Sequence, residues 1–292
     1  MTACPTILVG IYFVEMVTFL LRIRFPLPQT NHKSRKPVRR LRTMPTWATT
    51  IVSFIFLLLA WQLLVTWGKY DSFILPGPRA VGEQFLVVLA NGRLLKHSLI
   101  TILEVIPGLL IGFFVALPLG YLLAKSPLAE RLISPYLVAS QAIPIIAIAP
   151  LLTIWVSSTY WSRVLVAALV VFFPILIAII AGIRSVPPEL YEVMNSLKAT
   201  PWQVFRKLEV PASLPIVLAG LKVGATLSVI GALVGEFVQP KSEGLGYLLV
   251  TARYQFKTDL VFVILFTLAV IALSLYALVV LIEKRALRWQ TQ

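Results

Sequence analysis

The chain has 292 residues, of which 59% are hydrophobic and only 13% are charged, and its formal net charge is +14. A soluble domain usually has about 25% charged residues, so this composition excludes an ordinary soluble protein and indicates one that lies in a lipid bilayer. The basic residues lie mostly between apolar runs, which suits membrane topology better than nucleic acid, so we expect no nucleic-acid partner. Cys4 is the one cysteine, which excludes an internal disulfide.

The first 43 residues differ from the rest and are expected to form a basic N-terminal extension, 1–43, ahead of a membrane domain at 44–292. A short apolar run at 6–21 contains Glu15 and is followed by a strongly basic stretch at 22–43. The run at 6–21 is consistent with a signal-like segment, with a seventh span, or with a dispensable extension ahead of a true start at Met44.

Six later segments are apolar enough to cross a bilayer, for which a helix needs roughly 20 residues. They predict an all-α integral membrane protein with six core spans, at 47–67, 98–124, 134–157, 162–183, 214–236 and 260–282. Pro107, Pro118, Pro144, Pro150 and Pro174 fall inside these spans, where neighbouring helices can satisfy the freed backbone groups.

Small residues recur in the span at 214–236, which contains AGLKVGATLSVIGALVG. Glycine and alanine let two helix backbones approach closely in a membrane. This span is therefore expected to pack tightly against a neighbouring helix.

The lysines and arginines of the connections predict the orientation, since cytoplasmic loops are richer in them. Seventeen lie in one set of connections, which are 22–43, 125–131, 184–213 and the C-terminal tail, against eight in the alternate set. Both ends of the six-helix core and the segment 184–213 are thus expected on the cytoplasmic side.

The segment 184–213 is polar and carries the signals of two short helices joined by a tight bend. Pro187 and Pro188 start a helix that we expect to run over 188–198, and Thr200-Pro201 pairs an N-cap with a proline at the first helical position. The second helix is expected to end near 209, and Pro211 and Pro215 to mark the start of the next span.

The first short helix has an apolar stripe on one face. It consists of Leu190, Val193, Met194 and Leu197. Such a stripe either packs on its own protein or docks another protein, and the sequence leaves both interpretations open.

The same segment resembles the EAA loop of permease subunits in binding-protein-dependent ABC importers, whose pattern is E-A-A, three residues, G, nine residues, I-x-L-P. Glu192-Val193-Met194 stands at E-A-A, Lys198 at the glycine, and Leu208, Val210 and Pro211 at I, L and P. WQVFRKLEVPASLP at 202–215 is similar to the nitrate/sulfonate/taurine-type branch, and the resemblance extends through LPGPRAV (75–81), FFPI (172–175) and GLGYLL (244–249).

The resemblance implies a permease of the prokaryotic plasma membrane. It implies that Glu192, Val193, Met194, Lys198, Leu208, Val210 and Pro211 couple the chain to cytoplasmic ATPase subunits, with a second permease copy and an extracytoplasmic substrate-binding protein as further partners. The chain has no G-x-x-x-x-G-K-[ST] phosphate loop, so it is not expected to be an enzyme itself. Lysine at 198, where the family usually has glycine, predicts a looser or shifted bend.

The solute is the finer question. An acid at Glu104, together with YLVASQAIPIIAIAPLL at 136–152, is similar to permeases for riboflavin or for a pyrimidine precursor of thiamine. A buried carboxylate does not favour a sulfonate, taurine or nitrate anion, which is the alternative solute class. Trp155, Tyr160 and Trp161 can stack on a flat ring or, more simply, anchor the helix ends at the interface.

Three ionisable residues within or at the ends of spans are candidates for the pathway, namely Glu104, Lys222 and Glu236. Lys222 can instead snorkel to the cytoplasmic interface, Glu236 can mark an interface, and Glu104 can pair with a neighbouring helix. No cofactor or metal is expected. A secondary transporter or channel would show inverted repeats, and a membrane enzyme would show converging histidines or cysteines. Neither pattern is clear here.

Overall fold

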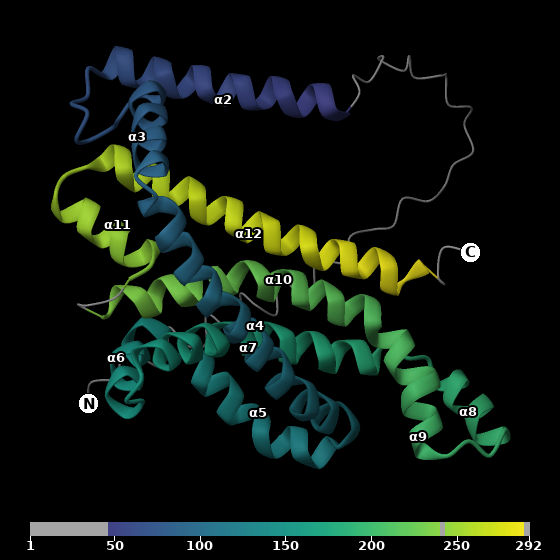
Figure 1. Cartoon of the computed structure of the whole chain (residues 1–292). Helices are drawn as coiled ribbons and strands as arrows, with labels where there is room; N and C mark the ends of the chain where they lie inside the picture. The colour runs from purple at the N-terminus through teal and green to yellow at the C-terminus, as the bar shows by residue number, and fades with distance from the viewer. Residues whose placement is uncertain (1–45, 240–242, 289–292) are drawn as a thin grey trace, which may run out of the picture. The chain divides into compact units, whose positions relative to one another are not determined.

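A computed structural model describes residues 46–239 and 243–288, and every regular element within these ranges is a helix (Figure 1). The expectations for 1–43 lie outside the described residues. Among the described residues, four helices are long and apolar enough to cross a membrane, namely α4 (Arg93–Lys125), α7 (Thr159–Arg184), α10 (Val210–Phe237) with the turns before it, and α12 (Thr258–Ala286). They coincide with four of the six predicted spans.

The predicted span at 134–157 is not one continuous helix. It is divided between α5 (Pro127–Gln141) and α6 (Ile145–Trp155), which are bent by 97° and form a fifth crossing only if they are counted together. The break lies at Pro144, which lacks an N–H and disfavours helical geometry at the residue before it. Pro107, Pro118 and Pro174 are tolerated inside helices, as expected.

The predicted span at 47–67 coincides with α2 (Thr46–Gly68). Its apolar portion among the described residues, Ile55–Gly68, is shorter than a full crossing. Two further helices, α3 (Pro78–Ala90) and α11 (Leu245–Tyr254), lie in the connections between spans. Both are short and amphipathic, so no long apolar run in the sequence predicts them.

The charged segment contains α8 (Pro188–Ser196), close to the first predicted short helix. The second begins at Pro201 as expected, with Thr200 as its N-cap and Gln203 completing a capping box. The prediction that it ends near 209 is wrong. α9 (Pro201–Val204) runs through a π-helical turn, η1 (Phe205–Glu209), directly into α10, so Pro211 lies inside a continuous helix instead of starting a new one.

The core is built around α7, which packs against both α4 and α10 (Figure 1). Glycines make these contacts close. A Cβ atom on Gly108 of α4 would lie 2.6 Å from the Cβ of Ala167, and one on Gly231 of α10 would lie 2.6 Å from the Cα of Ala167. The expectation that small residues in 214–236 serve close helix packing is therefore confirmed.

Candidate functional site

An ion pair joins α4 to α7 in the interior of the bundle. The Arg163 Nη1 atom lies 2.5 Å from the Glu104 Oε1 atom, and the side chains are 9% and 0% exposed. A charge buried without a partner destabilises a protein, so each of these two residues offsets the cost of burying the other. Arg163 also donates to the carbonyl oxygens of Thr159 and Glu243, at 3.2 and 2.8 Å.

Glu236 approaches this pair from the end of α10. It is 1% exposed and accepts hydrogen bonds from the Thr101 hydroxyl, at 2.7 Å, and from the Gly246 backbone N–H. The backbone at Gly244 must pass the Glu236 carboxyl group closely, with a φ of +144°, and a Cβ atom there would lie 2.3 Å from that group. Glycine is therefore required at 244 by both space and conformation.

Further polar contacts fasten the same end of the bundle. The Gln239 side chain donates to the Ser162 hydroxyl at 2.6 Å, and His97 Nδ1 accepts from the Gly244 N–H at 3.0 Å. The result is a polar network that ties the start of α4, the start of α7 and the end of α10 to the chain leading into α11. We call these residues the Arg163 network, namely His97, Thr101, Glu104, Ser162, Arg163, Glu236, Gln239 and Gly244.

All three candidate pathway residues are thus engaged in contacts between helices. Lys222 Nζ lies 2.9 Å from both carboxylate oxygens of Glu283 on α12, which forms an ion pair between α10 and α12. Glu236 is buried in the Arg163 network. The arrangement braces helices, and any role of Glu104, Lys222 or Glu236 toward a solute remains a prediction.

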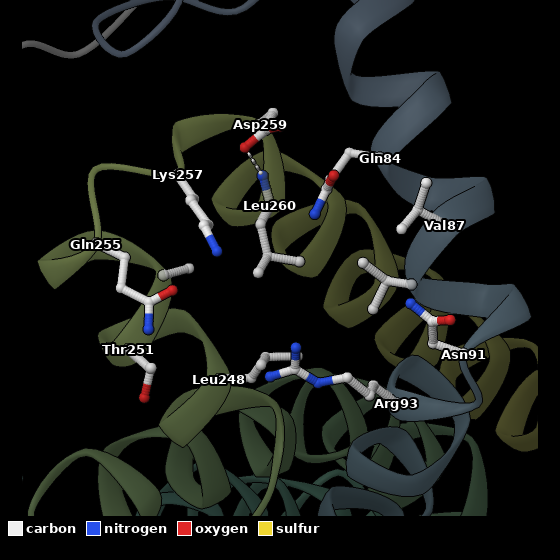
Figure 2. Close-up of a pocket in the computed structure, with 12 residues that line it drawn as sticks. Gln84, Val87, Asn91, Arg93, Leu248, Thr251, Gln255, Lys257, Asp259 and Leu260 are labelled. Carbon is white, nitrogen blue, oxygen red and sulfur yellow. Dashed lines mark hydrogen bonds between the residues drawn. The ribbon is translucent and has the colours of Figure 1, made fainter.

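A cavity of about 340 Å³ lies where α3, α11 and the starts of α4 and α12 meet. Figure 2 shows Arg93 and Lys257 reaching toward this hollow, with Gln84, Asn91 and Gln255 around it. Asp259 also lines it and accepts from the Leu260 N–H at 2.7 Å. The cavity has the size of a small-molecule site, and the side-chain amides and the arginine and lysine that line it can hydrogen-bond a polar solute.

The apolar stripe of α8 faces outward. Leu190, Val193 and Leu197 are 42%, 55% and 72% exposed, and no residue of α8 is buried. Of the two interpretations left open by the sequence, close packing on the described part of the chain, 46–239 and 243–288, therefore does not hold for these three side chains. Trp202, at the start of the following helix, is also 65% exposed.

The bend after α8 is closed and regular, contrary to the expectation of a looser turn. Lys198 adopts the left-handed conformation, with a φ of +51°. The N–H of Lys198 donates to the Asn195 carbonyl at 2.9 Å and that of Ala199 to the Met194 carbonyl at 3.0 Å, which is a complete Schellman motif. Lysine thus takes the conformation of the usual glycine at a cost in conformational energy.

Replacing Lys198 by glycine should therefore stabilise the protein by up to about 1 kcal/mol. The measurement is the thermal unfolding midpoint of the detergent-purified protein. Lys207→Gly is the control, because Lys207 lies in the helical turn η1, where glycine should destabilise by about 1 kcal/mol. A lower midpoint for Lys198→Gly would contradict the argument.

The remaining predicted coupling residues occupy two places. Glu192 is exposed and Met194 half-buried on α8. Leu208 lies in η1, and Val210 and Pro211 follow it without a break, as the first residues of α10. The two halves of the motif thus stand on either side of the bend, and their contact with another subunit stays a prediction.

Sequence reasoning missed most of the Arg163 network. Arg163 is one of the eight basic residues that the sequence places in the alternate set of connections, yet it is 7% exposed inside α7, and no sequence pattern points to His97. The available signal was Gly244 in GLGYLL, whose glycines pack against Glu236. In the part of the chain that the structure describes, no group of three or more His, Cys, Asp or Glu side chains is arranged to hold a metal ion.

A bundle of apolar spans, joined by a buried ion pair and carrying an exposed amphipathic helix outside those spans, has the architecture of an integral membrane protein. The family model described as "Binding-protein-dependent transport system inner membrane component" matches residues 108–288. The chain belongs to this family and is a permease subunit of an ABC importer. The resemblance found in the sequence is thereby confirmed.

Curated relatives place the chain in a defined branch of that family. It is 44% identical to the riboflavin transport system permease protein RibX of Chloroflexus aurantiacus, covering 82% of this chain and 89% of the relative. It is 32% identical to the formylaminopyrimidine transport permease protein ThiX of Halalkalibacterium halodurans, covering 81% and 94%. It is 29% identical to the putative aliphatic sulfonates transport permease protein SsuC of Bacillus subtilis, covering 90% and 95%.

A solved structure shares the fold. The inward-facing MetNI methionine ABC transporter contains a chain that aligns with a TM-score of 0.58 at 19% identity, covering 66% of this chain and 96% of that one. At this identity the likeness concerns the fold alone.

Proposed function

We propose that this permease imports riboflavin, delivered by an extracytoplasmic binding protein and driven by a separate ATPase. The observation that carries the solute is the 44% identity to a riboflavin permease over 82% of the chain, against 32% and 29% for the formylaminopyrimidine and sulfonate permeases. A pyrimidine vitamin precursor is the second candidate among neutral ring compounds.

The charge argument against an anionic solute loses its force. It relied on Glu104 as an extra buried carboxylate, but Arg163 lies 2.5 Å from that carboxylate and offsets its charge. A sulfonate-type anion therefore stays the alternative solute class, and the proposal of riboflavin depends on sequence identity.

The exposed stripe of α8 supports the proposal that this helix docks in a groove of the ATPase. Without a docking partner, the large apolar side chains of Leu190, Val193 and Leu197 would be exposed to water outside the candidate spans. An amphipathic helix laid into a groove is a recurrent mode of recognition. On this proposal α8 faces the cytoplasm, as the distribution of lysines and arginines predicts, and two permease copies form the pathway.

The test is growth of a riboflavin-auxotrophic bacterium on limiting riboflavin. The host would express this permease with its own ATPase and binding protein. We expect rescue by the wild type and loss of rescue for Val193→Arg, which places a charge in the apolar stripe. Asn195→Arg adds the same charge on the opposite face of α8 and should still rescue growth.

A parallel assay in a sulfur-starved host distinguishes the solute classes. Growth on taurine without any rescue on riboflavin would overturn the proposed solute and leave the importer class intact. Equal rescue by Val193→Arg and wild type would instead contradict the docking role of α8.

A further inference from the structure

Glu209 is a buried carboxylate at the point where the segment 184–213 joins the bundle. It is the last residue of the π-helical turn η1, immediately before α10, and it is 1% exposed. Single π-helical turns occur frequently at functional sites. A carboxylate so far removed from water needs strong partners.

The partners of Glu209 come from two different helices. Its Oε2 atom accepts from the Tyr121 hydroxyl of α4 at 3.0 Å, and its Oε1 atom accepts from the Lys125 ammonium of α4. Oε1 also accepts from the Tyr191 hydroxyl of α8 at 3.1 Å. The Lys125 Nζ atom also lies 4.9 Å from the centre of the Tyr191 ring, so the α4 lysine contacts the α8 tyrosine directly.

Tyr191 is a principal attachment of α8 to the rest of the chain. No residue of α8 is buried. Within the ranges that the structure describes, Tyr191 is the α8 residue whose side chain hydrogen-bonds to another helix. Burial and the adjacent Glu209 carboxylate raise the pKa of Tyr191 to about 12, so its hydroxyl remains a donor at physiological pH.

We infer that Glu209 is a positioning residue that transmits movement of α8 to α4, with Tyr191 on one side and Tyr121 and Lys125 on the other. This inference rests on the proposed docking of α8 in the ATPase. The Glu209 carboxylate is hydrogen-bonded to both α8 and α4. A shift of α8 would therefore displace this carboxylate through Tyr191 and strain its hydrogen bonds to Tyr121 and Lys125. Lys125 lies near the end of α4, the helix that also contains Glu104. The two residues are about 30 Å apart along the helix axis, at 1.5 Å of rise per residue.

The test follows the response of α4 to ATP in the complete permease–ATPase complex. Cys4 is the one native cysteine, so Cys4→Ser gives a background for a single reporter at Leu117→Cys. Leu117 lies on α4, beside a cavity that is also lined by Tyr121 and Phe205. The readout is the rate of maleimide labelling before and after trapping with ATP and vanadate.

We expect trapping to change the labelling rate several-fold in the background protein and to leave it almost unchanged in Tyr191→Phe and Glu209→Gln. Tyr136→Phe is the matched control, since Tyr136 is a 77% exposed tyrosine on α5, and it should respond as the background does. The amount of ATPase that copurifies and the thermal unfolding midpoint are measured for each variant. A merely structural role of Tyr191 would lower the midpoint and leave the trapping response intact.

Each outcome decides the inference. A full response in Tyr191→Phe and Glu209→Gln would overturn it, as would an α4 that does not respond in the background protein with ATPase bound. Failure of the ATPase to copurify with the wild type would instead refute the proposed docking of α8. If Glu209→Gln does not fold, Tyr191→Phe carries the test alone, because it removes one hydroxyl and leaves the two bonds from α4 in place.

Discussion

Replacing Arg163 by leucine is expected to destabilise the protein by about 3–5 kcal/mol, because it leaves the Glu104 carboxylate buried without its partner. Glu104 is fully buried, and the Arg163 Nη1 atom lies 2.5 Å from it. The substitution also removes the donor to the Glu243 carbonyl, which helps to hold the chain leading into α11. The measurement is the free energy of unfolding in detergent micelles, followed by tryptophan fluorescence.

Two further variants separate loss of the pair from loss of a large side chain. Arg163→Leu combined with Glu104→Leu should recover most of the stability, because no unpaired charge remains. Arg79→Leu breaks an ion pair with Glu83 whose side chains are 91% and 65% exposed, and it should cost less than about 1 kcal/mol. A double variant as unstable as Arg163→Leu alone would show that the two charges do not depend on each other.

Replacing Gly231 by alanine is expected to cost about 1–3 kcal/mol through overpacking between α7 and α10. The added Cβ atom would lie 2.6 Å from the Cα of Ala167, which is backbone and cannot move aside as a side chain can. The two helices must therefore separate along a closely packed interface. The thermal unfolding midpoint and the yield of folded protein from membranes report this change.

Gly82→Ala is the matched control for Gly231→Ala. Gly82 lies inside α3 and a Cβ atom there meets nothing within 4 Å, so alanine should stabilise the helix by about 1 kcal/mol. Opposite signs for the two substitutions are the expected result. If Gly231→Ala were as stable as the wild type, close contact at this position would not be needed for packing.

The sequence predicted those parts of the fold that depend on local signals. Long apolar runs located α4, α7, α10 and α12, and Thr200-Pro201 located a helix start. The prediction of one continuous span at 134–157 and the prediction of a helix that ends near 209 were wrong. A proline ends a helix in one setting and is tolerated in another, depending on the surrounding packing.

The candidate site was harder to predict, because its residues meet only in the folded bundle. From sequence alone, Arg163 is predicted to be a charge of a connection, since its partner Glu104 lies on a different helix. Glu209 stands at the unspecified position of I-x-L-P, and its partners Tyr121 and Lys125 lie far away in the sequence. Spacing within one segment contains no information about such contacts. The outward stripe of α8 was visible, but whether another part of the chain covered it was not.

The ion pairs also bear on how the chain enters the membrane during synthesis. Glu104 on α4 is made before α5 and α6, and its partner Arg163 arrives only with α7. Lys222 likewise precedes its partner Glu283 by 61 residues. A single charge near the centre of an inserting helix costs about 3 kcal/mol. The earlier helix of each pair must therefore keep its charge at an interface, or stay beside the insertion machinery, until the later helix is made. Assembly of this bundle consequently requires cooperation between helices that are far apart in the sequence and are synthesised one well after the other.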